Sequence, residues 1–399
     1  SRPLEENTIV FNDGTLPGDI VLSHDAANGM LILKATVSGA EIRLSNFTAD
    51  NPLGSRAVEY FRFADGSTLT YAQLLERGFD LAGGDADDQL QGTALADRIT
   101  GGAGNDSIAG GKSNDLLHGG AGNDTYYFNA GDGIDLIDDS ATAEAGNTLI
   151  FGEGIALADI ASFMSYEGNT LIIRVGSNGD EVHLTGFNPD AADSGPRAVQ
   201  TFRFADGTEM NYEDIVRNTF ILQGDIGNDT IQGTNLGDRL YGFEGTDTLN
   251  GGLGDDTLTG GADNDTLTGG EGSDTYVFNL GDGTDTIIDT ATAAQGNLIL
   301  FGEGITAADI RTHLNGTTLT IEYGNRGDSI LLPNFQYDAS RVVETLQFAD
   351  GSQVRMANLI DPATEGDDVI FGSPLVDVIS AKGGNDTITT YEDDDIING

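Results

Sequence analysis

The sequence of 399 residues contains no cysteine, and this absence removes several kinds of chemistry together. Disulfide bridges, zinc–thiolate and iron–sulfur centres, and cysteine nucleophiles are all excluded. Proline is also scarce, with 8 residues against 57 glycines, so the chain is neither collagen-like nor a proline-rich linker. We therefore expect the glycines to form turns.

Basic residues are few. Lysine and arginine together number 18 against 65 aspartates and glutamates, which gives a formal net charge of −47. Nucleic acids and anionic membranes are bound through clustered Lys and Arg side chains, so both are disfavoured as partners. A compact chain with this much negative charge repels itself, and divalent cations are its natural counter-charge.

Long apolar runs are missing as well. No segment approaches the roughly 18 apolar residues that a membrane-spanning helix needs, so we expect no membrane span. The sequence starts Ser1-Arg2-Pro3-Leu4-Glu5 and shows no signal peptide. It stops at Gly399, where one repeat ends, and both ends suggest a piece excised from a longer protein. The length predicts two to four domains.

What the sequence has instead is an aspartate that recurs every nine residues, each followed two residues later by an apolar residue or tyrosine in the first two blocks. A three-residue strand cannot stand alone, so such copies are expected to stack as a solenoid around a thin ladder of Leu and Ile. The aspartates are Asp88, Asp97, Asp106, Asp115 and Asp124 in the first block, Asp229, Asp238, Asp247, Asp256, Asp265 and Asp274 in the second, and Asp368, Asp377, Asp386 and Asp395 in the third.

A second, longer period alternates these blocks with another kind of segment. The motif Phe63-Ala64-Asp65-Gly66 returns at 204–207 and 348–351. Its first copy predicts a hairpin at Asp65-Gly66, and Thr70 with Gln73 has the spacing of a capping box that opens a short helix. The expected divisions are small β-rich modules at 1–76, 147–217 and 297–360, and repeat blocks at 83–140, 224–290 and 366–399.

The repeats have the composition of a calcium-binding turn. In the best-formed copies, at 101–109 and 251–259, six residues turn and three extend. Glycines permit positive φ, so backbone carbonyl oxygens can point inward, and the aspartate adds an anionic oxygen. Calcium takes six to eight such hard oxygen ligands at about 2.3–2.6 Å, whereas magnesium and zinc fit less well.

The ends and the second turns of the blocks depart from this pattern. The closing segments 128–133 and 278–283 are expected to complete terminal metal sites through Asp132, Asp135, Asp282 and Asp285. In the second turn of every block a leucine replaces the fourth-position glycine. Whether these turns pack or bind calcium is left open. The leucines are Leu95, Leu236 and Leu375.

These residues resemble the RTX (repeats-in-toxin) haemolysin-type calcium-binding repeats, whose signature is G-G-x-G-x-D-x-U-x. The segments between the blocks are similar to haemolysin-type calcium-binding related domains. The resemblance implies an all-β fold, in which calcium-loaded parallel β-rolls alternate with small β-rich modules. Two nonapeptides would make one turn of the roll, with Ca²⁺ between neighbouring loops. It also implies type I secretion from a bacterium, and an extracellular or cell-surface location.

The predicted function is therefore calcium binding that drives folding of a secreted protein, by a monomeric and non-catalytic chain. Its expected partners are calcium ions and the type I secretion machinery. No nucleophile, base and oxyanion site come together in the sequence. Two alternatives stay open: an adhesive or ligand-binding module of a large RTX adhesin, and calcium-triggered self-processing at Asp361-Pro362.

Overall fold

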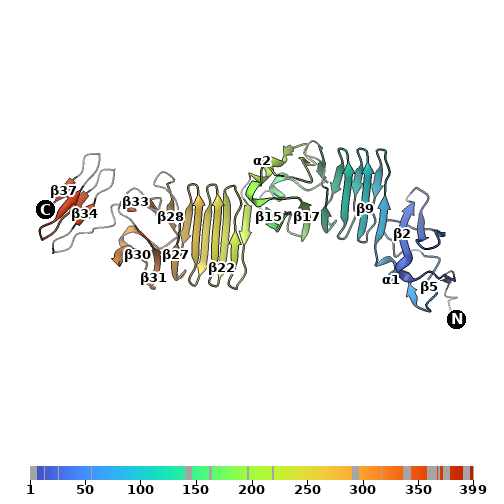
Figure 1. Ribbon diagram of the computed structural model, residues 1–399, viewed down its shortest axis with the longest axis horizontal. Helices are drawn as coiled ribbons and strands as arrows, with labels where there is room; N and C mark the ends of the chain where they lie inside the picture. Colours follow the sequence, from blue (N-terminus) through green and yellow to red (C-terminus); the bar gives the residue numbers. More distant parts are fainter. Residues whose placement is uncertain are drawn as a thin grey trace. The chain divides into compact units, whose positions relative to one another are not determined.

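The computed structural model is built almost entirely from short β-strands (Figure 1). It describes residues 7–12, 14–25, 27–54, 56–139, 146–160, 164–195, 197–217, 220–289, 296–315, 317–335, 343–356, 366, 369–371, 378–389 and 396–398. The chain forms two compact units. One consists of Ser1–Asn188 with Asp193–Asn218, and the other of Pro189–Ala192 with Thr219–Gly399.

The first unit opens with two three-stranded sheets and a short helix. The hairpin between β5 and β6 contains Gly66 at φ +86°, as its motif predicts. Helix α1 (Tyr71–Leu75) is capped reciprocally by Thr70 and Gln73, which confirms the capping box. One sheet contains β2 (Ile20–Asp25), β3 (Met30–Ala35) and β4 (Glu41–Ser45), and the other β1 (Thr8–Val10), β5 (Tyr60–Arg62) and β6 (Thr68–Thr70).

Two parallel sheets follow, because successive nonapeptides place their strands alternately in one sheet and the other. Each strand pairs with the strand two repeats further on, so Ile108 lies opposite Tyr126 and Ile99 opposite Leu117. This pairing confirms the predicted parallel β-roll. One sheet contains β8 (Gln89–Gln91), β10 (Ser107–Ala109) and β12 (Thr125–Phe128), and the other β7 (Phe79–Ala82), β9 (Asp97–Ala103), β11 (Leu116–Ala121) and β13 (Ile134–Ile137).

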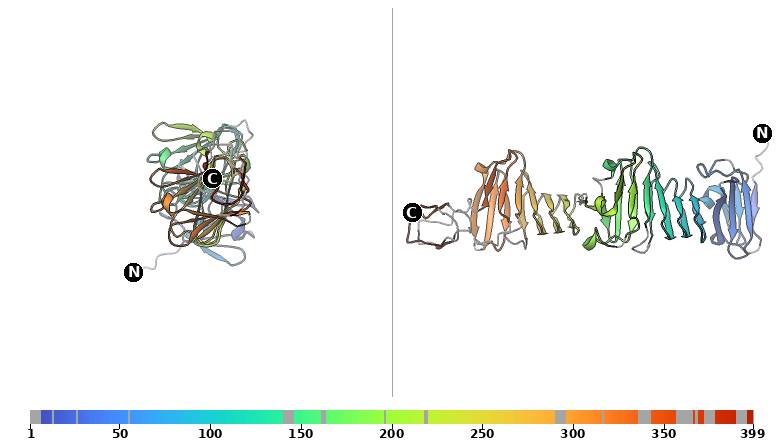
Figure 2. Two further views of the ribbon diagram at one scale, coloured as in Figure 1. Left: turned by 90° about the vertical axis from the view of Figure 1, so that its left-hand side faces the viewer. Right: turned by 90° about the horizontal axis from the view of Figure 1, so that it is seen from above.

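The next β-rich module continues both sheets of this roll. Strand β14 pairs in parallel with β12, and β17 with β13, so the module closes the end of the stack (Figure 2). The segments predicted at 83–140 and 147–217 therefore share one core. The added strands are β14 (Thr148–Phe151), β18 (Thr201–Arg203) and β19 (Glu209–Asn211) on one sheet, and β15 (Met164–Glu167), β16 (Thr170–Val175) and β17 (Asp180–Thr185) on the other.

A ladder of apolar residues runs through roll and module alike. Tyr126, Leu149 and Phe202 stand in register on three successive strands, and all three are buried. Full burial of side chains of this size contributes about 1.5–3 kcal/mol each. The buried residues therefore form one core that runs along the stack, as the apolar residue in every nonapeptide predicts.

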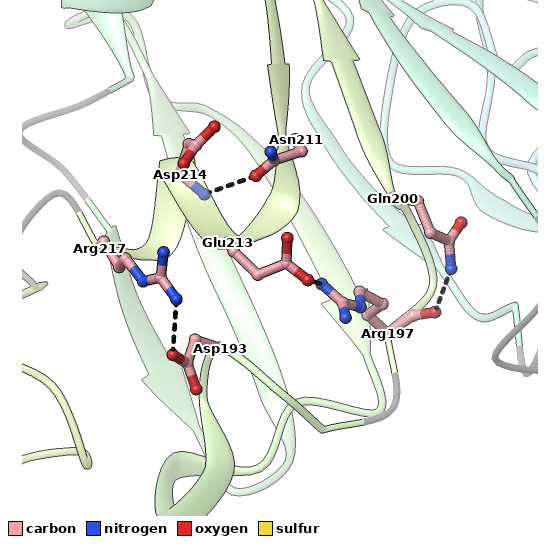
Figure 3. Close-up of polar contacts among 7 residues, drawn as sticks. All are labelled: Asp193, Arg197, Gln200, Asn211, Glu213, Asp214 and Arg217. Carbon is pink, nitrogen blue, oxygen red and sulfur yellow. Dashed lines mark hydrogen bonds and ion pairs between the residues drawn. The ribbon is translucent and has the colours of Figure 1, made fainter.

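Helix α2 (Tyr212–Val216) ends this module, and polar contacts fasten it to the loop before β18 (Figure 3). The Arg197 guanidinium contacts Glu213 at 2.8 Å and lies 4.8 Å from the Tyr212 ring centroid. Arg217 contacts Asp193 at 3.2 Å. These ion pairs are partly exposed, so they orient the helix more than they stabilise it.

The second unit repeats this plan. A second roll shares both of its sheets with a third module, through pairing of β26 with β28 and of β27 with β31. One sheet contains β20 (Phe220–Gln223), β22 (Asp238–Glu244), β24 (Thr257–Ala262), β26 (Thr275–Phe278), β28 (Leu298–Phe301), β32 (Thr345–Gln347) and β33 (Gln353–Arg355), and the other β21 (Thr230–Gln232), β23 (Thr248–Leu253), β25 (Thr266–Glu271), β27 (Thr284–Ile287), β31 (Asp328–Leu332), β30 (Thr318–Tyr323) and β29 (Arg311–Asn315).

Four strands of the third repeat block are described. Strand β34 (Val369–Phe371) pairs in parallel with β36 (Thr387–Thr389), and β35 (Val378–Ser380) with β37 (Ile396–Asn398). Both pairs join residues 18 positions apart, as in the two rolls. None of the helices in the described part of the chain has the length and apolar character of a membrane-spanning segment.

Candidate metal centre

The repeat aspartates form a continuous chain of hydrogen bonds along each roll. The backbone N–H of Asp238 donates to Oδ1 of Asp256 at 2.7 Å, and the N–H of Asp256 donates to Oδ1 of Asp274 at 2.9 Å. Each bond spans 18 residues, or two nonapeptides, so one turn of the roll contains two repeats. The same bond joins Asp88 to Asp106, Asp97 to Asp115, Asp106 to Asp124, Asp229 to Asp247, and Asp247 to Asp265.

Residues beyond the regular repeats extend this chain of bonds. Asp135 accepts from the N–H of Asp115, and Asp285 accepts from that of Asp265. The amide oxygens of Asn147 and Asn297 then accept from Asp124 and Asp274. The sequence prediction missed both asparagines, although each stands two residues before a buried apolar residue, as the repeat aspartates do.

The second carboxylate oxygen, Oδ2, has no hydrogen-bond partner in most of these aspartates. Each aspartate whose Oδ2 lacks a partner is at most 3% exposed. A buried carboxylate oxygen without a partner is costly, and native structures rarely keep one unless a water or an ion satisfies it. The aspartates with an unpartnered Oδ2 are Asp106, Asp115, Asp124, Asp135, Asp247, Asp256, Asp265, Asp274 and Asp285.

A glycine makes room for this oxygen. A Cβ atom placed on Gly251 would lie 2.1 Å from Oδ2 of Asp256 and 2.6 Å from the carbonyl oxygen of Gly269. No side chain fits there, and the glycine leaves a place where a carboxylate oxygen and a carbonyl oxygen of the next turn converge. A donor set of carboxylate and carbonyl oxygens, without sulfur or imidazole, fits Ca²⁺.

The second residue of each turn decides whether Oδ2 is paired. In the later turns this residue is left-handed, with φ between +79° and +113°, and its N–H does not reach the aspartate. In the first two turns of each roll it is not left-handed, and its N–H donates to Oδ2. These bonds run from Gly84 to Asp88, Thr93 to Asp97, Asp225 to Asp229 and Thr234 to Asp238, at 2.5–2.7 Å.

The second turns are also covered by neighbouring loops. The N–H of Ala94 donates to the carbonyl of Ala49 in the first module. In the second roll, Asn235 exchanges hydrogen bonds with the short 3₁₀ segment Pro189–Ala191 and the following Ala192. The threonine hydroxyls of Thr93 and Thr234 donate to Asp97 and Asp238 as well. The second turn of the first roll is thus packed and internally satisfied, whereas in the second roll Oδ1 of Asp238 is buried without a hydrogen-bond partner.

Burial shifts the protonation of the unpaired carboxyls. It raises the pKa of Asp256 from 3.8 to about 9 and that of Asp285 to about 8. Burial, with the charge of Asp135 nearby, raises the pKa of Asp115 to about 8. Without a cation the charged forms of these groups are therefore disfavoured in the folded chain, and a bound divalent ion would reverse this preference.

The closing segments place their aspartates in two settings. Asp135 and Asp285 belong to the chain of bonds described above. Asp132 and Asp282 instead accept from the N–H of Asn129 and Asn279 within their own turns. Aspartates of the following modules, which the sequence did not predict, bind the same turns: Asp180 accepts from the N–H groups of Gly131 and Gly133, and Asp328 accepts from Gly281.

A tyrosine closes the last turn of each roll. The Tyr126 hydroxyl donates to Asp139 Oδ2 at 2.5 Å and accepts from the Gly119 N–H at 2.7 Å. Tyr276 makes the equivalent bonds with Asp289 and Gly269. Asp139 is 2% exposed. The sequence identified these tyrosines only as apolar positions, because nothing in the period-nine pattern indicates what their hydroxyl groups contact.

The third block is only partly described. Asp386 is half-buried and directly precedes β36. The predicted ligands Asp368, Asp377 and Asp395 lie outside the described residues, as does the Asp361-Pro362 bond.

Two family profiles match the sequence. The RTX calcium-binding nonapeptide repeat (4 copies) matches residues 82–117, 100–135, 223–258, 241–276, 253–287 and 371–399. The haemolysin-type calcium binding protein related domain matches residues 31–73 and 171–214.

The chain is similar to several solved structures, two of which are described here, and no curated protein sequence matches it. The extracellular lipase LipA from Serratia marcescens is 23% identical, with a TM-score of 0.24, over 60% of this chain and 38% of the lipase. The AlgE6R3 subunit of the Azotobacter vinelandii mannuronan C5-epimerase is 26% identical, with a TM-score of 0.22, over 28% of this chain and 72% of that subunit.

Proposed function

Because the chain belongs to the RTX calcium-binding repeat proteins, whose repeats bind several Ca²⁺ ions, we propose that calcium binding folds its rolls after secretion from a bacterial cell. The single observation that carries this proposal is the row of buried aspartate oxygens without partners. An unfolded chain keeps these carboxylates hydrated. Folding buries them, so a cation that binds only the folded roll stabilises it by mass action.

We assign calcium to the later turns of each roll. There Oδ2 is unpaired. At Asp106 and Asp256 it converges with a carbonyl oxygen of the next turn, whereas at Asp124 and Asp274 the oxygen nearby is the hydroxyl of Tyr126 or Tyr276. We assign these four aspartates as calcium ligands in one stack of each roll. In the first two turns an N–H already occupies the aspartate oxygen, so Asp88, Asp97, Asp229 and Asp238 serve mainly to start the stack.

RTX repeats are structural rather than catalytic, and we propose that this chain hydrolyses no substrate. Any activity of the whole protein would then belong to other segments. Calcium is abundant outside cells and scarce inside them, so calcium-dependent folding would keep the chain unfolded until export.

We also propose that the chain does not cleave itself at Asp361-Pro362. After long incubation with calcium we expect the chain to stay intact, with no fragment that starts at Pro362.

A calcium titration followed by far-UV circular dichroism tests the proposal. In excess chelator we expect the β signal of the rolls to be lost, about 1 mM Ca²⁺ to restore it, and the same concentration of Mg²⁺ to fail. Magnesium is the matched control because it has the same charge but demands a smaller octahedral site. Identical spectra with chelator and with calcium would refute calcium-dependent folding.

A further inference from the structure

An aromatic pair lies on the outer face of the second roll. Tyr241 and Phe243 project from β22, with ring centroids 6.2 Å apart and ring planes inclined by only 21°. Phe243 is 45% exposed, and Ile226 beside it is 81% exposed. Aromatic and apolar side chains therefore form one exposed surface in a chain whose surface is otherwise strongly acidic.

Phe243 holds an unfavourable backbone conformation. It is the second residue of its nonapeptide and has φ +79°. The other left-handed residues at this position in the two rolls are all glycine: Gly102, Gly111, Gly120, Gly252, Gly261 and Gly270. In the third block Lys382, at φ +59°, is a second residue other than glycine that holds this conformation. A bulky side chain at positive φ is strained, and such strain concentrates at functional sites. Glycine would fold more readily, so the fold gives no reason for the phenylalanine.

The pair borders a hollow of about 630 Å³, the size of a small-ligand site. Its lining includes Asp225, Ile226, Tyr241, Phe243, Glu244 and Thr259, and no lysine or arginine. The surface of the hollow is almost entirely apolar, and the residues that line it carry two carboxylates and two hydroxyl groups. We call these six residues the aromatic hollow.

The first roll offers an internal comparison. Asp85, Thr100 and Gly102 occupy the positions equivalent to Ile226, Tyr241 and Phe243, each 141 residues earlier. The two rolls have the same strand pairing, so the fold needs none of the three apolar side chains. Replacement of an acid, a threonine and a glycine by apolar and aromatic residues on one face indicates a binding surface peculiar to the second roll.

We propose that the aromatic hollow binds a neutral oligosaccharide. A pyranose ring has apolar C–H groups on its faces and hydroxyl groups around its rim. The faces suit the rings of Tyr241 and Phe243, and the hydroxyls suit Asp225, Glu244 and Thr259 as hydrogen-bond partners. Two aligned rings match successive sugar units along a chain. This inference goes beyond calcium-dependent folding, since it concerns the outer face of the folded roll.

Other ligand classes fit less well. Anionic polymers would be repelled by the two carboxylates and by the net charge of −47. A small organic cation would pair with the carboxylates but fill little of the hollow. A stable protein partner normally contacts about 20–30 residues per side, many more than line this hollow.

Titration calorimetry of the full chain in excess calcium tests the proposal. The probes are cellohexaose, mannohexaose and maltohexaose, with polygalacturonate as the anionic counterpart and choline as the cationic one. We expect one of the neutral hexasaccharides to bind. Because the chain has no tryptophan, the fluorescence of its 11 tyrosines, Tyr241 among them, gives a second readout.

The decisive variant is Phe243→Gly, which introduces the glycine that the other later turns of the two rolls have at this position. It should weaken oligosaccharide binding about tenfold or more, as loss of an aromatic anchor does, while the melting temperature in calcium stays equal or rises. Tyr127→Ala, at a 39% exposed tyrosine of the first roll, is the control and should bind as the wild type. Absence of binding to all three neutral sugars by folded wild type overturns the proposal. The proposal is also overturned if Phe243→Gly binds the oligosaccharide as tightly as the wild type does. Binding of choline or polygalacturonate more tightly than any neutral hexasaccharide would overturn it as well.

Discussion

The first two turns of each roll and the turns that follow carry the same aspartate in the same register, yet they treat its carboxylate differently. Asp97, in a second turn, accepts from the N–H of Phe79 and from the N–H and hydroxyl of Thr93. Asp256, in a later turn, accepts only from Asp238 through Oδ1. We propose that the conformation of the second residue, and not the aspartate of the motif alone, decides whether a turn binds calcium.

The largest effect on calcium affinity should come from removing one unpaired carboxylate. Asp256→Asn keeps an acceptor for the Asp238 N–H but removes the charge, so we expect the calcium affinity of the second roll to fall about tenfold or more. Asp97→Asn is the matched control. It should lower the melting temperature, because Thr93 or Phe79 loses an acceptor, but leave the calcium midpoint unchanged. Calcium titrations of both variants measure these effects. Equal shifts in the calcium midpoint would show that the two kinds of turn bind calcium alike.

A loss of folding stability, rather than of calcium affinity, is expected where Asn147 ends the chain of hydrogen bonds in the first roll. Asn147 is fully buried, and its side chain bonds the Asp124 N–H, Asp139 and the Ala198 carbonyl. Asn147→Ala leaves all three without their partner and should cost about 2–4 kcal/mol. Urea unfolding in saturating calcium measures it. A change below about 0.5 kcal/mol in the free energy of unfolding would show that Asn147 does not couple the roll to the following module.

Acid should partly replace calcium. Burial holds the pKa of Asp256 at about 9 and that of Asp115 at about 8 in the folded chain, against 3.8 for an ordinary aspartate. The calcium-free folded state therefore binds more protons than the unfolded state, so its stability falls as pH rises from about 4 to about 9 and recovers as pH falls. In chelator, we expect the β signal to be larger at about pH 5 than at about pH 8. The opposite order would show that these carboxyls are ionised without calcium.

The smallest effect should follow Thr93→Val. The substitution removes the hydroxyl bond to Asp97 but keeps the backbone N–H bond to Oδ2, so about 1 kcal/mol of stability should be lost. The calcium midpoint should stay that of the wild type. A thermal melt and a calcium titration on one sample measure both, and a gain in bound calcium would mean that the hydroxyl alone keeps the turn closed.

Much of the fold could be predicted because the repeat period is simple. Spacing of nine placed the short strands and the buried Leu and Ile ladder, and the capping box at Thr70 placed helix α1. The shared sheets of roll and module could not be predicted in this way. They depend on pairing of β12 with β14 and β13 with β17, across segments whose sequences have no common period.

At the site, the sequence identified the aspartates but not their two environments. It marked the second turns by leucine at the fourth position, whereas the bond that fills Asp97 comes from Thr93 at the second position. Asn147 and Asp180 were missed because they reach the roll from the following module. Phe243 was not identified from the sequence, because its exposure and the contact of its ring with Tyr241 are evident only once the strands are stacked.

Calcium positions determined by anomalous X-ray scattering from crystals grown with calcium test the central claim most directly. We predict peaks beside the unpaired oxygens of Asp106, Asp124, Asp256 and Asp274. We predict none beside Asp97, whose oxygens are taken by N–H and hydroxyl donors. A calcium peak beside Asp97 as strong as the one beside Asp256, or no peak beside Asp256, would contradict the claim that the unpaired carboxylate makes the site.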